Sequence, residues 1–162
     1  SKYLHRFSKK LLTFHPKAEI ISNVSLSDFK AQLDAADLND DFGYYKEIGY
    51  INAHGTGTIL NDKTESLAIN EVFNVALNPP LVSSTKSLHG HLIGGAGAIE
   101  LVSCIMSIND GVIPPTINFD AKDPECDLNL VINASREEKV DYALSNAFAF
   151  GGTNSVLIIR KI

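Results

Sequence analysis

Apolar positions in the first half of the chain recur with two different periods. At 18–22 and 47–53 they form short runs typical of strands, and the second run is apolar enough to predict burial on both faces. Between these runs, residues 25–38 carry apolar positions at helical spacing. Residues 1–17 show a weaker helical pattern among basic side chains and form a separate N-terminal segment without an assigned role. The main domain is therefore predicted to span 18–162.

Two further helices are expected in the middle of the chain. The first is predicted to start at Asp62, which can cap it, with Glu65 three residues later as an approximate capping box. The second covers 94–110, has almost no polar face, and can be stopped by Gly111. A helix of this kind, like the strand at 47–53, predicts burial on all sides. We therefore expect another chain, or a further part of this protein, to pack on both elements.

The second half of the chain ends in a series of strands. Apolar runs at 81–84, 128–133, 141–150 and 154–162 predict four of them, and Gly151-Gly152 predicts a hairpin between the last two. The order of strand, helix, strand, helix and then several strands is typical of an α/β fold whose sheet has an antiparallel end.

Composition narrows the class of protein. The chain has 162 residues, 44% hydrophobic residues and a net charge of -5, which predicts a soluble globular domain and excludes a broad nucleic-acid-binding surface. It contains no run approaching the roughly 20 apolar residues of a membrane span, so a cytoplasmic location is the default expectation. Cys104 and Cys126 are too few for a disulfide framework and are expected to be reduced thiols.

Polar motifs interrupt the apolar elements at three places. His54–Thr58 follows the strand at 47–53, Ser84–His91 follows the next strand, and Ser145–Asn154 surrounds the final hairpin. Loops at the carboxyl ends of strands build the site in open α/β sheets. The three motifs are therefore expected to converge.

These motifs, with the segments around them, resemble the C-terminal half of the β-ketoacyl-acyl-carrier-protein synthases. The resemblance runs from about Tyr50 to Arg160 through five motifs in order, "INAHGTGTILNDKTESLAI", "VSSTKSLHGHLIGGAGAIE", "DGVIPPTINF", "DPECDLNLV" and "ALSNAFAFGGTNSVLI". It implies an α/β fold of thiolase-like type, with a mixed sheet, a buried central helix and helices packed on the sheet. It also implies decarboxylative Claisen condensation of malonyl-acyl carrier protein with an acyl thioester.

The resemblance assigns the catalytic roles. His54 and His91 match the histidines that donate hydrogen bonds to the malonyl thioester oxygen, and Lys86 matches a lysine that pairs with the residue here numbered Glu100. Loss of CO2 leaves an enolate, whose oxygen two preorganised neutral imidazoles can stabilise. The Lys86–Glu100 pair is expected to orient this site rather than to transfer protons.

The resemblance also assigns substrate contacts. Thr56 and Thr58 match threonines that bind the phosphopantetheine arm, and Phe150 matches a gating phenylalanine between acyl pocket and malonyl site. Phe148 and Gly151, on the same segment, are expected to line the substrate path. The family usually has glycine where this chain has Ala149, which predicts a stiffer gate.

No cofactor is expected to be required, and metal binding has two candidate locations. One is a buried monovalent cation, implied by the resemblance for an all-oxygen set that a hydrogen-bond network explains equally well. Its residues are Asn52, Glu100, Ser145 and Asn146. The other is the pair His89 and His91, which is less favoured because no Cys or Asp cluster completes a site nearby.

The acyl-accepting cysteine of the family belongs to an N-terminal half, and neither Cys104 nor Cys126 corresponds to it. This chain is therefore expected to need a complementary cysteine-bearing half, to meet an acyl carrier protein, and to form an oligomer. Two alternatives stay open: a non-catalytic subunit resembling a chain-length factor, and a malonyl decarboxylase that does not condense.

Overall fold

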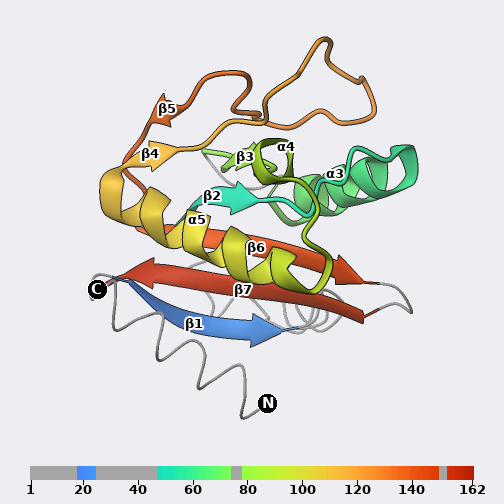
Figure 1. The fold of residues 1–162 in the computed structure, drawn as a ribbon. Helices are drawn as coiled ribbons and strands as arrows, with labels where there is room; N and C mark the ends of the chain where they lie inside the picture. Colours follow the sequence, from blue (N-terminus) through green and yellow to red (C-terminus); the bar gives the residue numbers. More distant parts are fainter. Residues whose placement is uncertain (1–17, 25–46, 74–77, 150–152) are drawn as a thin grey trace.

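A mixed five-stranded sheet is the centre of the computed structural model, which describes residues 18–24, 47–73, 78–149 and 153–162 (Figure 1). The strand order is β1-β7-β6-β2-β3. These strands are β1 Ala18–Val24, β2 Ile48–Asn52, β3 Leu81–Ser83, β6 Tyr142–Ala149 and β7 Thr153–Lys161. A separate two-stranded ribbon pairs β4 Val112–Ile113 with β5 Arg136–Glu137. The helices are α3 Ile59–Phe73, α4 Lys86–His89, the 3-10 turn η2 Ile93–Gly95 and α5 Ala96–Asp110.

Strand direction decides where the polar loops meet. Strand β2 runs parallel to both β3 and β6, whereas β7 is antiparallel to β6 and β1. Asn52, the last residue of β2, is in register with Ser83 of β3 and Ser145 of β6. The carboxyl ends of β2 and β3 and the middle of β6 therefore share one region of the sheet. The predicted mixed sheet with an antiparallel end is confirmed.

Helices cover the two faces of the sheet. Tyr50 packs in one apolar core with Leu101 and Ile105 of α5, while its neighbour Ile51 packs in the other with Ile69 of α3. Burying an apolar side chain of this size contributes about 2 kcal/mol, so the packing on each face stabilises β2 in the sheet. Among the described residues, α5 and α3 cover the two faces of β2, so this strand itself needs no second chain to bury it, while the expected partner stays a prediction.

Helix α5 is buried on one side only. Its residues Leu101, Cys104 and Ile105 face the sheet, whereas Val102 is half-buried and Met106 is 47% exposed. Figure 1 shows α5 lying across the front of the sheet with no described element on its outer side. Within the described residues this outer side is uncovered, so its burial by another chain or a further part of the protein stays a prediction. The outer side is still apolar, which is the property that suggested an additional partner.

Gly111 ends α5 as predicted, because it adopts the left-handed conformation (φ 68°) and donates its N–H to the Ser107 carbonyl at 3.0 Å. The predicted start of α3 is wrong. The helix begins at Ile59, and the N–H of Asp62 donates to the Thr58 carbonyl at 3.0 Å, so Asp62 lies inside the first turn. Glu65 does not serve as a capping-box residue.

The predicted strand at 128–133 is wrong as well. Only isolated bridges form there, between Leu130 and Val82 and between Ile132 and Thr116, and the chain turns away where Asn133 adopts a φ of 56°. The helices predicted within 1–17 and 25–38, and the hairpin turn at Gly151-Gly152, lie outside the described residues. In the described part of the chain, none of the helices has the length and apolar character needed to cross a membrane.

Candidate functional site

The loops that follow β2 and β3 are joined directly. The N–H of Ala53 donates to the Ser83 carbonyl at 2.8 Å, and the hydroxyl of Ser84 donates to the Gly55 carbonyl at 2.8 Å. Gly55 has a φ of 41°, and a Cβ built on it would lie 2.5 Å from the Cβ of Ser84. Only glycine suits this position, because it tolerates both the left-handed backbone and the close approach.

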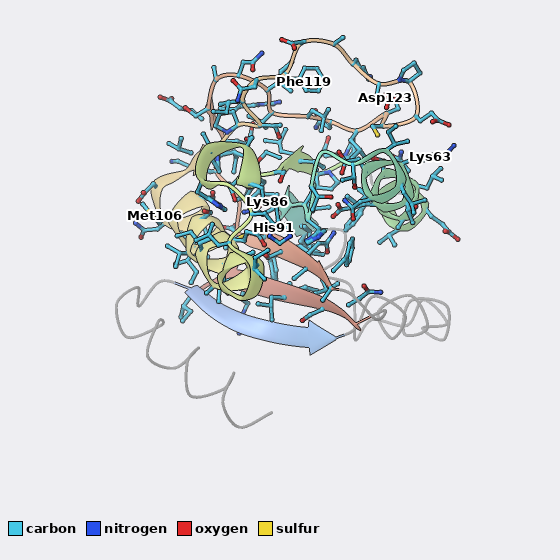
Figure 2. The ribbon with its side chains drawn as sticks, turned by 45° about the vertical axis from the view of Figure 1, so that its right-hand side comes forward. Lys63, Lys86, His91, Met106, Phe119 and Asp123 are labelled. Carbon is cyan, nitrogen blue, oxygen red and sulfur yellow. The ribbon has the colours of Figure 1, made fainter. Side chains whose placement is uncertain are left out.

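This junction brings the two candidate catalytic histidines together. The ring centroids of His54 and His91 are 5.7 Å apart, with the rings meeting edge to face. His54 is buried, with 8% of its surface exposed, whereas His91 is exposed at the start of the segment that leads into α5. His91 and Lys86 line the same cavity, and Figure 2 shows both close to the beginning of α5.

Backbone N–H groups define the tautomer of each ring. The N–H of Phe148 donates to Nδ1 of His54 at 3.3 Å, and the N–H of Ile93 donates to Nδ1 of His91 at 3.1 Å. A nitrogen that accepts a hydrogen bond cannot carry the proton. Each neutral ring therefore holds its proton on Nε2, so both imidazoles are donors through the nitrogen that the backbone leaves free.

The environment of His54 keeps it neutral. Burial, together with smaller contributions from Lys86 and His91, lowers its pKa from 6.5 to about 4. At neutral pH this imidazole is an uncharged hydrogen-bond donor.

Lys86 and Glu100 form a buried ion pair between Nζ and Oε1, with side-chain exposures of 5% and 0%. Burial raises the pKa of Glu100, and the bond from Lys86 opposes this rise. The other carboxylate oxygen, Oε2, is buried without a hydrogen-bond partner among the described residues. The pairing that the resemblance implied is present, and it leaves one carboxylate oxygen uncompensated.

Glu65 is a site residue that the sequence interpretation missed. Its carboxylate accepts the N–H groups of His54 at 2.8 Å and Gly55 at 2.9 Å, and the side-chain amide of Asn146 at 2.9 Å. Burial raises its pKa, while these hydrogen bonds lower it. One sequence signal could have revealed it: Glu65 lies on the apolar stripe of α3, four residues before Ile69, where a carboxylate requires polar partners.

Of the residues predicted to contact the substrate, the structure describes Thr56, Thr58 and Phe148. Thr56 and Thr58, whose hydroxyls lie 3.0 Å apart, line a cavity of about 510 Å³ together with His91 and Lys86. The ring of Phe148 lies 5.3 Å from that of His54. Phe150 and Gly151 lie outside the described residues, so their predicted roles, including the gate, stay predictions.

The four residues proposed to hold a cation, which are Asn52, Glu100, Ser145 and Asn146, fit such a site only in part. Glu100 Oε2 is an unpartnered buried acceptor, and Ser145 is buried in register with Asn52. However, the amide of Asn52 already donates to Thr85 at 3.0 Å, and that of Asn146 donates to Glu65. The unpaired Oε2 is therefore the observation that favours a hard cation here.

Among the described residues, the third histidine and the two cysteines take other positions. His89 uses both ring nitrogens, Nδ1 donating to the Gly90 carbonyl at 2.8 Å and Nε2 accepting from Thr85 at 3.1 Å. Within the described ranges, no three His, Cys, Asp or Glu side chains are grouped as metal ligands. Cys104 is fully buried, which raises its thiol pKa far above the usual value, while Cys126 lines the cavity of Thr56 and Thr58.

Comparison with known protein families gives a match over more than half of the chain. A family model described as "Beta-ketoacyl synthase, C-terminal domain" matches residues 30–120. Nodulation protein E of Rhizobium sp. (strain N33) is 50% identical over 117 residues, which cover 72% of this chain and 29% of that protein. The 3-oxoacyl-[acyl-carrier-protein] synthase 2 of Synechocystis sp. is 51% identical over 119 residues, covering 70% of this chain and 27% of that protein. The chain thus spans less than a third of these relatives' length.

Solved structures similar to this chain are ketosynthases as well. A β-ketoacyl synthase from Burkholderia phymatum STM815 superposes with a TM-score of 0.75 at 33% identity, covering 90% of this chain and 38% of that one. A type II polyketide ketosynthase in complex with its acyl-carrier protein has a TM-score of 0.74 at 27% identity, covering 90% and 38%. The ishigamide ketosynthase/chain length factor has a TM-score of 0.69 at 45% identity, covering 72% and 28%.

Proposed function

The chain belongs to the β-ketoacyl synthase family, whose C-terminal domain it contains, and we propose that it supplies the decarboxylation site of a condensing enzyme. In this proposal a complementary part provides the acyl-bearing cysteine. His54 and His91 then hold the thioester oxygen of a malonyl group bound to an acyl carrier protein. The reaction is decarboxylative Claisen condensation of malonyl-acyl carrier protein with an acyl thioester.

The observation that carries the proposal is the tautomer of the paired imidazoles. Both Nδ1 atoms accept backbone N–H groups, and the ring centroids are 5.7 Å apart, so two Nε2–H donors are available in one place. When the bond between the malonyl methylene and its carboxylate breaks, CO2 leaves and the electron pair moves toward the thioester oxygen. Donors aimed at that oxygen stabilise the enolate as its charge develops.

The second step uses the enolate carbon. It attacks the carbonyl of the acyl group on the cysteine of the complementary part, the new carbon–carbon bond forms, and the thiolate leaves. The histidines of this chain need no net proton change in either step, which agrees with the lowered pKa of His54. Removal of one oxyanion donor typically reduces the rate by about 10²- to 10³-fold.

Lys86 and Glu100 are proposed to position this site rather than to react. Lys86 is the first residue of α4 and lines the cavity with His91, and its charge is neutralised by Glu100 on the buried side of α5. If a monovalent cation binds, Glu100 Oε2 would hold it, with oxygens of Asn52, Ser145 and Asn146 as the other candidate ligands. Bound there, it would supply the positive charge that this carboxylate oxygen lacks.

Two features support the proposed partners. The cavity lined by Thr56 and Thr58 opens beside His91 and can accept an extended polar arm such as phosphopantetheine. The apolar outer side of α5, which includes Met106, is a surface on which the complementary part can pack. One solved relative is a ketosynthase with its acyl-carrier protein, and another is a ketosynthase/chain length factor.

Reconstitution tests the proposal. The chain is mixed with an N-terminal ketosynthase half that carries the cysteine, and product is measured from acyl- and malonyl-acyl carrier protein. We expect product only from the mixture, with His54→Ala and His91→Ala each reducing turnover at least a hundredfold. Cys126→Ser, which alters the same cavity without removing a histidine, should retain turnover.

Three results would contradict the proposal. Product from this chain alone would remove the need for a complementary half. Unchanged turnover in His54→Ala would indicate a scaffold of the chain-length-factor kind. Release of CO2 from malonyl-acyl carrier protein without chain extension would indicate a decarboxylase.

A further inference from the structure

Ser66 lies on the side of α3 that approaches the loop between β4 and β5. Lys63, three residues earlier, pairs with the carboxylate of Glu125 in this loop. Asn70, four residues later, donates its side-chain amide to the carbonyl of Asp127 at 3.0 Å. Residues three and four apart share one face of a helix, so Ser66 lies between two contacts that join α3 to the loop. Figure 2 shows Lys63 where α3 approaches this loop.

The hydroxyl of Ser66 has no hydrogen-bond partner among the described residues, although only 4% of the residue is exposed. Helical serines and threonines often donate to a carbonyl of the preceding turn. The other hydroxyls of the described helices do so, and the donors and acceptors are Thr64 and Leu60, Ser87 and Ser84, Ser103 and Ile99, and Ser107 and Ser103. Ser66 is the exception, so its hydroxyl can both donate to and accept from a ligand.

The hydroxyl of Ser66 reaches the open space of a cavity. Among the described side chains, Glu100 Oε2 is the one polar atom that is both sealed from solvent and unpaired, so the Ser66 oxygen is not sealed. Ser66 is a lining residue of the cavity of about 510 Å³ into which Thr56 and Thr58 also face. A buried, unpartnered hydroxyl on the wall of a cavity is suited to bind a polar group of its occupant.

The surroundings of Ser66 define the chemistry of this occupant. Val82, Leu128 and Leu130 line the same cavity and pack with the apolar core beneath α3. A hydrogen bond gains strength among apolar side chains. A fitting ligand is therefore a flexible chain in which amides alternate with apolar groups. Pantetheine has this chemistry, because its amides are separated by methylene groups and follow a gem-dimethyl carbon.

We propose that Ser66 is a ligand-binding residue of this cavity, whose hydroxyl donates a hydrogen bond to an amide carbonyl of a pantetheine arm. The inference rests on the proposed function, in which the arm enters the cavity beside His91. It adds a contact on α3 to those expected from Thr56 and Thr58, which lie on the loop before this helix. The arm is then held by two successive elements, and loss of the Ser66 hydroxyl weakens binding without loosening the fold.

Titration of the ¹⁵N-labelled chain with pantetheine tests this contact. Shifts of the backbone signals of α3 and of the loop before it give a dissociation constant. We expect Ser66→Ala to raise this constant about three- to tenfold, as for the loss of one hydrogen bond between neutral groups. Ser103→Ala is the matched control, because it removes the same atom from a serine of α5 that bonds within its own helix. This control should bind pantetheine like the wild type.

Thermal unfolding separates binding from folding. Ser66→Ala breaks no hydrogen bond among the described residues and introduces the residue with the highest helix propensity. Its unfolding midpoint should therefore equal or exceed that of the wild type. A lower midpoint would show that the hydroxyl has a partner inside the protein, which overturns the proposal.

Kinetics of the reconstituted enzyme give a third readout. A contact that is equally strong in the bound substrate and in the transition state changes KM but not kcat. With malonyl-pantetheine as the substrate, Ser66→Ala should raise KM about three- to tenfold and keep kcat within about twofold. A lower kcat with an unchanged KM would assign Ser66 to the reacting end of the substrate and overturn its contact with the arm.

The two proposals fail in distinguishable ways. Equal dissociation constants for Ser66→Ala and the wild type would show that the hydroxyl binds only water, which overturns the role of Ser66. The same follows if Ser103→Ala weakens binding as much as Ser66→Ala does. If pantetheine causes no shifts in the wild-type chain, the role of Ser66 fails together with the arm-binding part of the proposed function. If Ser66→Ala weakens binding as expected and His91→Ala retains turnover, the proposed function fails while the contact of Ser66 stands.

Discussion

The carboxylate of Glu65 holds the backbone of His54 from the far side of the loop that joins β2 to α3. Oε1 accepts the N–H of His54 at 2.8 Å, and Oε2 accepts the N–H of Gly55 at 2.9 Å. The bond from Asn146 ties the same carboxylate to β6. One buried side chain therefore connects three separate elements around a candidate catalytic histidine.

Replacement of Glu65 should loosen this loop. In Glu65→Gln the amide nitrogen must replace one acceptor oxygen, so at least one buried N–H loses its partner, and we expect a loss of about 1 to 3 kcal/mol in the free energy of unfolding. Urea denaturation provides the measurement. Thr64→Ala, an exposed change on the same helix, should stay within about 0.5 kcal/mol of the wild type. Equal effects of both variants would contradict the role assigned to Glu65.

Replacing Lys86 alone should reduce the free energy of unfolding more than replacing both members of the buried pair Lys86–Glu100. Lys86→Met leaves Glu100 as an unpaired buried carboxylate, and we expect a loss of about 3 to 5 kcal/mol. The double variant Lys86→Met with Glu100→Leu should recover part of this loss, as measured in a double-mutant cycle.

Lys122 provides the control for this cycle, because it pairs with Asp127 at 2.6 Å with side-chain exposures of 58% and 77%. Lys122→Met should change stability by less than about 1 kcal/mol. If the effects of the substitutions at Lys86 and Glu100 were additive, the two side chains would not stabilise each other, and the predicted coupling would be wrong.

The lowered pKa of His54 makes a prediction about pH. The folded chain resists protonation of His54 until about pH 4, whereas the unfolded chain accepts this proton near pH 6.5. The unfolded state therefore binds more protons in this window, and the contribution of His54 to the free energy of unfolding should decrease as pH falls from 6.5 to 4. In an NMR titration the ring signals of His54 should stay constant from pH 8 to 5.5. A midpoint near 6.5 would contradict the buried, uncharged state.

Gly55 and Gly57 allow a matched comparison in one loop. Both have a positive φ, but a Cβ on Gly55 would contact Ser84 at 2.5 Å, whereas none of the neighbouring atoms is within 4 Å of a Cβ on Gly57. Gly55→Ala should therefore destabilise the fold clearly more than Gly57→Ala, which pays only the backbone strain of about 1 kcal/mol. Thermal denaturation measures both, and equal losses would show that Ser84 can move aside.

The outer side of α5 should matter for assembly rather than for folding. Met106→Glu places a charge on this exposed apolar position, so the chain should keep its unfolding midpoint but bind a complementary ketosynthase half at least tenfold more weakly. Leu67→Glu, at a position on α3 that is 59% exposed, is the control and should bind normally. Figure 2 shows Met106 on α5, at the other end of the helix from His91. Equal binding by both variants would exclude this side of α5 from the interface.

Much of the architecture could be predicted from local pattern. The apolar run at 47–53 and the helical spacing at 94–110 correspond to β2 and α5, because burial imposes a period that residues near in sequence display. Gly111 ended α5 as expected for the same reason: a helix stop depends on one residue and its immediate neighbours. The start of α3 was misjudged because two polar residues, Asp62 and Glu65, matched a capping pattern without having the positions of a cap.

The sequence by itself determined the types of the main elements and the family resemblance, since both are encoded in local order and spacing. Only the tertiary structure decided the partners of the site. Phe148 donates to His54 from 94 residues away, and Asn146 donates to Glu65 from 81 residues away. Such pairs depend on strand register, which parallel pairing of β2 and β6 sets across the sheet. No local period carries that information, because register is a relation between segments that meet only after the chain has folded.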